Sequence, residues 1–268
     1  MPETIVVPLD GSDAAEAALG PAAAIARRTG ARLVLVSSRL GGPGDPDAYL
    51  GDIQTGLDVP SVETVVVRDR RAPGAVDLVA GQHPDPVVCM RTSGRSGLRA
   101  VVFGSVAQEV LRRARVPVLL VGPAVAPDWE LPTDVVACVD DRPASRSMVP
   151  LAAEYAGALG SRLWIVTVVP ARGREADPAR AAAFEDACRR LVEERAESVA
   201  PMEARWRVVH GDPAEELIAM ASGFPAALMV MATRGHVGLG PATVGSVTTD
   251  VVRRATGPVL ARAFYGFD

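Results

Sequence analysis

The sequence contains no lysine, because all 28 of its basic residues are arginines. A phosphate-binding P-loop needs a lysine that reaches the phosphates, and a Schiff-base enzyme needs a lysine amine, so both classes are excluded. Cysteine is scarce as well: the three cysteines lie far apart, which disfavours a zinc site or a disulfide framework. Cys89 and Cys138 lie in apolar strand-like runs, where we expect them to be small buried hydrophobes.

Long apolar runs and blocks of basic charge are also missing. No run approaches the roughly 20 apolar residues of a membrane helix, and the sequence starts in a strand-like run without a basic leader. The formal net charge of −4 disfavours a dedicated nucleic-acid binder. Apolar residues make up 49% of the chain, enough for a substantial core. We therefore expect a soluble, cytoplasmic protein that binds neither membrane nor nucleic acid.

The chain contains an internal repeat. The segment GSVAQEVLRRARVPVLLV from Gly104 matches GSVTTDVVRRATGPVLAR from Gly245, and three further pairs of segments match in the same order upstream. Four collinear matches indicate a duplication, and the seam falls in a proline-rich linker near residues 123–132. The sequence therefore predicts two domains, at residues 1–124 and 132–268.

Each copy alternates short β-branched runs with alanine-rich stretches. The first copy predicts strands at Thr4–Leu9, Leu33–Ser37, Val62–Val67, Pro86–Met90 and Pro117–Val121, and helices at Asp13–Thr29 and Ser105–Arg115. Nearly continuous apolar strands are typical of a parallel sheet that helices cover on both faces. We therefore predict an α/β fold of two tandem Rossmann-like domains with doubly wound sheets, which bind ligands at the carboxyl ends of their strands.

The copies differ between their second and third strands. Residues 178–199 form a good helix in the second copy, whereas residues 38–61 are rich in Gly, Pro and Asp. Because these residues disfavour a long helix, we predict a short or broken helix at that place in the first copy.

A loop followed by a helix start recurs in both copies. A glycine ends the loop after the fourth strand, nine residues follow, and Gly-Ser then opens a helix. The residues are Gly94, Gly104 and Ser105 in the first copy, and Gly235, Gly245 and Ser246 in the second. A helix start offers unpaired N–H groups and the positive end of the helix dipole, which suit a phosphate. Ordinary N-caps and turn glycines give the same pattern, so the structural interpretation stays open.

This pattern resembles the universal stress protein family, whose nucleotide-binding members carry Gly, two residues, Gly, nine residues and then Gly-Ser or Gly-Thr. The first-strand aspartates Asp10 and Asp140, the segment HGDPAEELI at residues 210–218 and the closing RRAxxPVL strand are similar too. The resemblance covers nearly the whole chain in two copies. It implies two five-stranded parallel sheets of strand order 3-2-1-4-5, whose last strands pair the halves into a pseudo-dimer.

The resemblance also implies an adenine nucleotide, ATP with or without Mg²⁺. The implied contacts are ribose for Asp10 and Asp140, adenine for the backbone of Ser38 and Val168 at the end of each second strand, and ribose or phosphate for the glycines and serines of the recurring loop. Two residues depart from the motif, because its first glycine is Arg91 in one copy and Ala232 in the other. Arginine would fill the ribose–phosphate space or pair with phosphate, so we expect the better pocket in the second copy.

Three functions stay open on this basis. The first is a regulatory stress-response protein that binds ATP and hydrolyses little or none of it. The second is a degenerate member that binds no nucleotide and acts as a protein-interaction scaffold. The third is an ATP pyrophosphatase-type synthetase, which the segments LDGSD and VDDRP disfavour because they lack that family's SGGxDS-like loop. We expect no catalytic residue and no metal ligands, and the sequence leaves protein partners and homodimer formation open.

Overall fold

The computed structural model describes residues 1–38, 44–92, 104–170, 178–234 and 245–264, and within them ten strands form one sheet. The strands of the first half are β1 (Thr4–Pro8), β2 (Arg32–Ser38), β3 (Val62–Val67), β4 (Pro86–Arg91) and β5 (Val118–Val121). Those of the second half are β6 (Asp134–Cys138), β7 (Arg162–Pro170), β8 (Ala204–Gly211), β9 (Ala227–Arg234) and β10 (Val259–Phe264).

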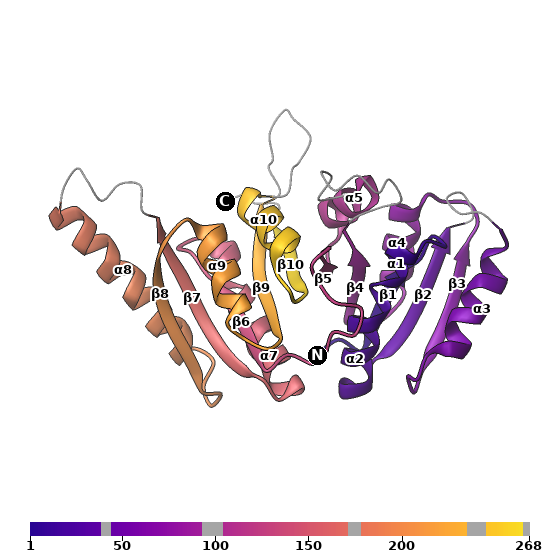
Figure 1. The fold of residues 1–268 in the computed structure, drawn as a ribbon, viewed down its shortest axis with the longest axis horizontal. Helices are drawn as coiled ribbons and strands as arrows, with labels where there is room; N and C mark the ends of the chain where they lie inside the picture. Colours follow the sequence, from indigo (N-terminus) through magenta and orange to yellow (C-terminus); the bar gives the residue numbers. More distant parts are fainter. Residues whose placement is uncertain (39–43, 93–103, 171–177, 235–244, 265–268) are drawn as a thin grey trace.

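The strand order along the sheet is β3-β2-β1-β4-β5-β10-β9-β6-β7-β8 (Figure 1). Neighbouring strands are parallel throughout each half, and the order within the first half is 3-2-1-4-5. The second half repeats this order in the opposite direction along the sheet. The predicted α/β class is therefore confirmed.

Helices cover both faces of the sheet. The helices of the first half are α1 (Asp13–Glu16), α2 (Leu19–Thr29), α3 (Pro46–Gly56), α4 (Ala72–Ala80) and α5 (Ser105–Arg113). Those of the second half are α6 (Pro143–Arg146), α7 (Met148–Leu159), α8 (Pro178–Glu197), α9 (Pro213–Ser222) and α10 (Ser246–Arg254). One core layer contains the buried residues of α2, α3, α7 and α8, and the other contains those of α4, α5, α9 and α10.

The central strands bury both of their faces, which explains their continuous apolar sequence. Ile5, Val6 and Val7 of β1 are fully buried. Ile5 and Val7 belong to one core layer and Val6 to the other, because successive side chains of a strand point to opposite faces.

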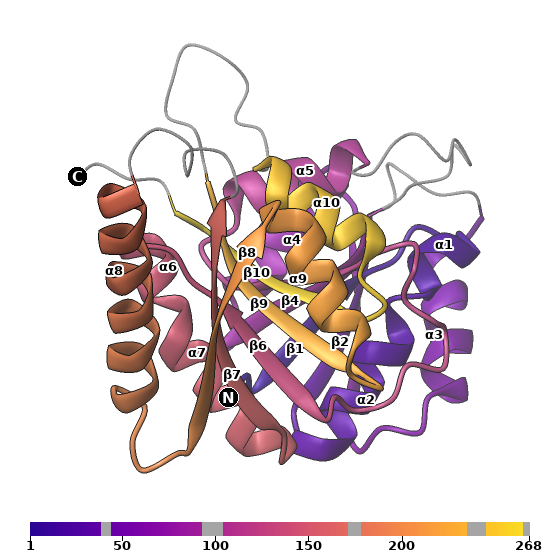
Figure 2. The ribbon, with the colours of Figure 1, turned by 60° about the vertical axis from the view of Figure 1, so that its left-hand side comes forward.

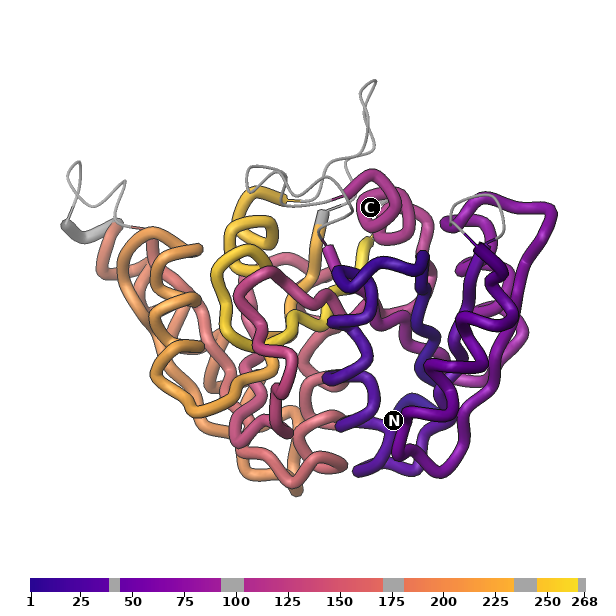
Figure 3. Tube along the Cα trace, turned by 45° about the vertical axis from the view of Figure 1, so that its right-hand side comes forward, coloured from indigo at the N-terminus to yellow at the C-terminus, as the bar shows by residue number. Residues whose placement is uncertain are grey.

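The two halves join through their last strands. β5 and β10 pair antiparallel, with Leu119 opposite Leu260, and both side chains are buried in the same core layer. The linker adds Val125 and Trp129 to that layer, and Figure 3 shows the two halves side by side along the joined sheet. Gly122 follows β5 closely against α10, since a Cβ atom there would lie 1.8 Å from the Val252 carbonyl oxygen. The expected pairing of the halves is thus present as one continuous sheet and core.

Several predicted elements change at their ends. The helix predicted over Asp13–Thr29 is two helices, α1 and α2. Pro21 lacks an N–H group and its ring would clash with the carbonyl of Ala17, so a continuous helix is broken there. The second half shows the same break between α6 and α7, where Pro150 lies four residues after Arg146.

The predicted difference between the copies is confirmed. α3 has 11 residues and buries only Leu50, whereas α8 has 20 residues and buries Cys188 and Val192. α4 was not predicted from the sequence: Pro73 and Gly74 in its first turn resemble loop residues. Proline is nevertheless well tolerated in a first helical turn, where its missing N–H group would have had no partner.

Candidate functional site

The strand order reverses between β1 and β4 in the first half and between β6 and β9 in the second. Ligands of open α/β sheets bind outside the carboxyl ends of the strands at such a reversal. The helices α5 and α10 begin at this same edge of the sheet, at the top of Figure 1. Each half therefore has an equivalent place for the predicted nucleotide.

In the first half, a local turn holds the first-strand carboxylate. The backbone N–H and the hydroxyl of Ser12 donate to Oδ1 of Asp10 at 3.1 and 2.5 Å. Ser12 also caps α1, because its hydroxyl oxygen accepts from the N–H of Ala15 at 3.2 Å. Gly11 between them has a φ of 78°, a left-handed conformation that favours glycine. The Asp-Gly-Ser sequence thus positions the half-buried Asp10 at the strand end.

In the second half, the equivalent carboxylate has a charged neighbour. Nη1 of Arg142 lies 3.2 Å from Oδ2 of Asp140, and the backbone N–H of Arg142 donates to Oδ1 at 3.1 Å. The backbone N–H of Asp140 in turn donates to the hydroxyl of Ser145 at 2.8 Å. Both partners of the ion pair are about half exposed, at 50% and 45%, so the pair is weak and a ligand can displace it at small cost.

Both candidate helices begin without a side-chain cap. Gly104 and Gly245 are the N-cap residues of α5 and α10, and neither has a side chain that could accept from the first N–H groups. The hydroxyl-bearing residues that follow, Ser105 and Ser246, are exposed. Within the described residues, no N-cap side chain bonds to the amides of either first turn, and amides at the positive end of a helix dipole suit an anion.

The ends of β4 and β9 distinguish the two halves. Arg91 ends β4 as a half-buried side chain, and burial lowers the pKa of its guanidinium group, which still stays charged. The equivalent residue on β9 is the half-buried Ala232, which leaves this space without a long side chain. The first half therefore places a cation where the second half has only a methyl group.

The residue that follows Arg91 and the residue that follows Ala232 are both buried threonines, which sequence reasoning missed. In the first half, the Thr92 hydroxyl donates to the Val121 carbonyl at 3.4 Å, and the Gly104 N–H donates to the Thr92 carbonyl at 2.6 Å. In the second half, the Thr233 side chain is 3% exposed, and its hydroxyl has no hydrogen-bond partner among the described residues. The presence of threonine at the same position of both copies was the sequence signal that could have identified these residues. A buried hydroxyl without a partner is costly, so it invites a ligand or water.

The residues predicted to meet adenine lie on the second strand of each half. Ser38 ends β2 as predicted and is buried, and its hydroxyl donates to the carbonyl of Arg70 at 2.5 Å. Val168 was expected to end its strand, but β7 continues two residues further, to Pro170. The strand is longer because Val169 and Pro170 still pair with β8. Gly94 and Gly235 lie outside the described residues.

Other titratable groups near these edges are held in unreactive forms. The Tyr49 hydroxyl of α3 donates to Oε1 of Glu16 at 2.9 Å, and burial together with Glu16 and Asp10 raises the pKa of this phenol. In the second half, burial, Asp141 and Glu185 raise the pKa of the Cys188 thiol. Each group therefore stays protonated at neutral pH and suits packing or hydrogen bonding better than nucleophilic attack.

Among the described residues, no three His, Cys, Asp or Glu side chains gather at a spacing that would hold a metal ion. Within the same residues, no helix has the length and apolar character needed to cross a bilayer.

The model of the universal stress protein family matches residues 1–122 and 133–261, so nearly the whole chain is covered in two copies. The chain therefore belongs to the universal stress protein family. No curated protein matches it.

Solved structures with the same fold extend over the whole chain. A functionally unknown protein from Pseudomonas aeruginosa PAO1 is 19% identical, with a TM-score of 0.70 over 97% of this chain and 92% of that one. A putative universal stress protein from Pseudomonas aeruginosa UCBPP-PA14 is 19% identical, with a TM-score of 0.67 and coverage of 97% and 93%. A universal stress protein from Archaeoglobus fulgidus is 16% identical, with a TM-score of 0.66 and coverage of 97% and 98%. The shared fold is thus a two-copy architecture.

Proposed function

We propose that the chain binds ATP in its second half and acts as a regulatory protein of the stress response, with little or no hydrolysis. One observation carries the proposal. The end of β9 combines the small Ala232 with the buried Thr233 hydroxyl, which has no hydrogen-bond partner among the described residues, and both lie close along the chain to the uncapped start of α10. A phosphate oxygen can accept from both kinds of donor, the hydroxyl and the first-turn amides.

The remaining predicted contacts fit the same ligand. Asp140 lies at the end of the central strand, where a carboxylate can accept from the hydroxyls of a ribose once Arg142 turns away. The backbone of β7 near Val168 would meet the base. Magnesium, where it accompanies ATP, would be held mainly by the phosphates, because Mg²⁺ keeps several waters and takes few protein ligands at such sites.

We infer that the first half binds nucleotide weakly or not at all. Arg91 places a half-buried guanidinium group at the end of β4, where the second half has Ala232. The first half would then fit the alternative function, a scaffold that pairs with the second half and contacts other proteins. We also propose two domains at residues 1–124 and 132–268, and the family-model ranges 1–122 and 133–261 support a division near the linker.

A thermal-unfolding scan tests the proposal. Purified protein, checked for carried-over nucleotide, is heated with and without ATP, in the presence and absence of Mg²⁺, with GTP as the matched control. Ligand at about 100-fold its dissociation constant stabilises by about 2.7 kcal/mol, which raises the midpoint by about 2–4 °C per kcal/mol. A shift with ATP and one bound nucleotide per chain by calorimetry supports the proposal. No shift and no carried-over nucleotide would favour the scaffold function for both halves.

A further inference from the structure

The strand β8 forms one edge of the ten-stranded sheet. β8 ends the sheet and, within the described residues, pairs only with β7. Figure 2 shows it in front, between α8 on one side and α9 on the other. An unpaired strand edge presents a row of backbone N–H and C=O groups that another chain can pair with, and proteins normally blunt or cover such edges.

The other end of the sheet shows how such an edge is blunted. At β3, Glu63 lies next to Val34 and forms an ion pair with Arg32 at 3.4 Å. Within β3, only Thr64 is exposed, and it is small and polar. This edge offers neither unbalanced charge nor a large apolar side chain to a partner.

β8 carries different residues at the equivalent places. Trp164 of β7 pairs with Arg205, and its counterpart Val34 of β2 pairs with Glu63. By this register, Arg205, Trp206 and Arg207 of β8 correspond to Glu63, Thr64 and Val65 of β3. All three residues of β8 are exposed, and Trp206 is one of the few large apolar side chains that are. The edge strand of the second half, β8, is thus basic and aromatic where the edge strand of the first half, β3, is neither.

The two arginines are held in place on one face of the strand. The guanidinium carbons of Arg205 and Arg207 lie 5.4 and 5.7 Å from the ring centroid of Trp164. The indole N–H of Trp164 donates to Asp134 at 2.8 Å, and Arg162 binds both oxygens of the same carboxylate. Because Asp134 is neutralised by Arg162, the charges of Arg205 and Arg207 have no ion-pair partner among the described residues.

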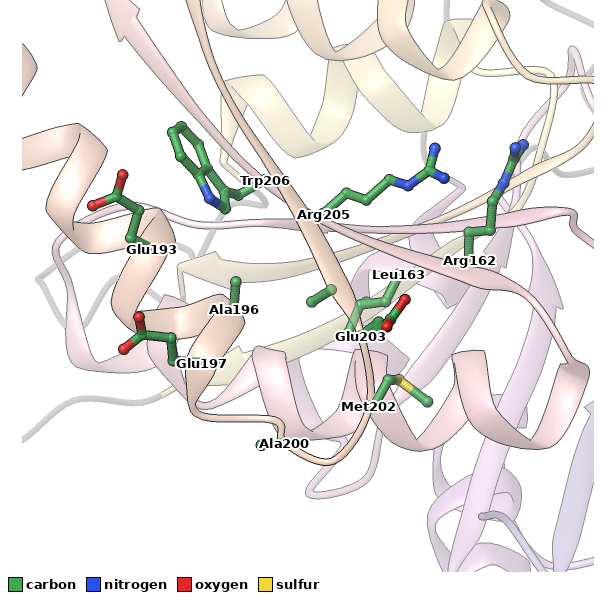
Figure 4. Close-up of a pocket in the computed structure, with 11 residues that line it drawn as sticks. Arg162, Leu163, Glu193, Ala196, Glu197, Ala200, Met202, Glu203, Arg205 and Trp206 are labelled. Atoms are coloured by element: carbon green, nitrogen blue, oxygen red, sulfur yellow. The ribbon is translucent and has the colours of Figure 1, made fainter.

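The opposite face of the strand has a place for an apolar side chain. A groove of about 550 Å³ lies between β8 and the C-terminal part of α8 (Figure 4). Met202 and Trp206 contribute apolar surface to its lining, and carboxylates outnumber cations in it: Glu193, Glu197 and Glu203 against Arg205 and the Asp134-bound Arg162 at its rim. Those carboxylates would repel an acidic side chain in the groove, so acidic residues of a partner belong on the arginine face.

Self-pairing of β8 with a second copy of this chain is disfavoured in the register that is centred on Trp206. Antiparallel pairing of β8 with itself about Trp206 would place Arg205 of each copy against Arg207 of the other. Like charges directly opposite each other in a sheet are destabilising. A basic partner strand would meet the same repulsion, so the charge pattern selects an acidic one.

We propose that the free edge of β8 binds an extended segment of another protein in which acidic and apolar residues alternate. The segment adds a strand to the sheet, its acidic side chains face Arg205 and Arg207, and an apolar side chain enters the groove beside Trp206. Backbone pairing supplies the affinity, and alternate side chains supply the specificity. This binding involves the opposite end of the second half's sheet from the β5–β10 junction and does not depend on a nucleotide.

Fluorescence anisotropy with the full chain tests the proposal. The probe is a fluorescein-labelled peptide of alternating glutamate and valine, compared with a lysine–valine peptide and with a glutamate–valine peptide carrying N-methylated central amides. We expect saturable, salt-sensitive binding of the first peptide only. Equal binding of the lysine peptide, or no binding at all, would overturn the charge argument. Equal binding of the N-methylated peptide would show that no strand is added.

A charge-swapped variant separates recognition from folding. Arg205→Glu/Arg207→Glu should weaken the glutamate–valine peptide at least about tenfold and allow the lysine–valine peptide to bind instead. The matched control Arg27→Glu/Arg115→Glu makes the same change in net charge on exposed residues of the first half and should leave affinity unchanged. Peptide binding should also slow hydrogen exchange of the β8 amides. A swapped variant that keeps its preference for glutamate would overturn the proposal.

Discussion

In the first half of the chain Arg91 ends the fourth strand, and an Asp-Gly-Ser turn holds Asp10 in place. In the second half Ala232 occupies the place of the arginine, while Asp140 is paired with Arg142 instead. The frame around these residues is the same in strand order and in the uncapped starts of α5 and α10. The two halves therefore share one frame and differ in the side chains that surround the proposed site.

The largest expected loss of stability comes from a substitution at Asp134, the first residue of β6. Asp134 is fully buried and accepts hydrogen bonds from Arg162, Trp164 and Thr133, whereas the first half has Thr4 at the equivalent place. We expect Asp134→Asn to lower the free energy of unfolding by about 3 kcal/mol, because the buried side chain loses its charge-assisted hydrogen bonds from the half-exposed Arg162 and from Trp164. Urea denaturation measures this loss, with Glu63→Gln as the exposed control at below about 1 kcal/mol.

The same substitution should change the dependence of stability on pH. Burial alone would raise the pKa of Asp134, but the bonds from Arg162, Thr133 and Trp164 outweigh it and lower the pKa. A lowered folded-state pKa means that the stabilisation is complete well above the ordinary aspartate value of about 3.9 and is lost as the pH falls below it. The wild-type protein should therefore lose more stability than Asp134→Asn between about pH 5 and pH 2. Parallel losses would contradict this assignment.

The next largest effect concerns the ligand. Ala232→Arg gives the second half the residue of the first, so the variant should lose the stabilisation of about 2.7 kcal/mol expected from ATP at 100-fold its dissociation constant. Thermal scans with and without ATP measure the loss, and the unliganded midpoint controls for folding. A variant that keeps the full ATP shift would show that nucleotide does not approach the end of β9.

The junction between the halves should respond to a smaller change. The repeat aligns Gly122 with Ala263, so Gly122→Ala gives the first half the residue that the second half has at this position. A Cβ atom at Gly122 would lie 1.8 Å from a backbone oxygen of α10, so we expect a destabilisation of about 2 kcal/mol in urea denaturation. Gly56→Ala, where a Cβ atom would meet nothing within 4 Å, is the matched control. A loss of stability no larger than that of the control would mean that α10 can shift away from Gly122 at little cost.

The first half offers the converse of the ligand experiment. Arg91→Ala removes the half-buried guanidinium group from the end of β4, while Asp10, Ser12 and the start of α5 stay in place. We expect calorimetry to show a second, weaker ATP site, so that the stoichiometry rises from one to two. A stoichiometry that stays at one would mean that removing the Arg91 side chain is not enough to let the first half bind ATP.

The smallest effect should come from the ion pair beside the second site. Arg142→Ala frees the Asp140 carboxylate for a ribose, so we expect ATP affinity to rise by about two- to fivefold, in keeping with the small energy of exposed pairs. Titration calorimetry measures the change. A fall in affinity would show that Arg142 turns toward the phosphates when ATP binds.

Much of the fold follows from short-range patterns in the sequence. Continuous apolar runs predict the buried parallel strands, and the repeat predicts that both halves share one topology. The break between α1 and α2 was missed although Pro21 signals it, because the alanine-rich composition around it favours a long helix. α4 was missed because proline and glycine in a first turn resemble a loop.

The site is less predictable, since it depends on side chains that meet through the fold. The motif locates the carboxylates and both helix starts. It does not reveal that Arg142 pairs with Asp140, or that the Thr92 hydroxyl has a hydrogen-bond partner while the Thr233 hydroxyl has none within the described part of the chain. Similarly, the contact of Arg205 with Trp164 requires the register between β7 and β8, which no local pattern encodes.

The antiparallel pair of β5 and β10 has a consequence for how this protein is maintained in the cell. Two separate subunits would part on dilution, whereas here the linker makes the pairing intramolecular and therefore independent of protein concentration. Because the core layers run across the junction, the stability of one half depends on the other. A half that binds no ligand would therefore still be needed to stabilise the other half.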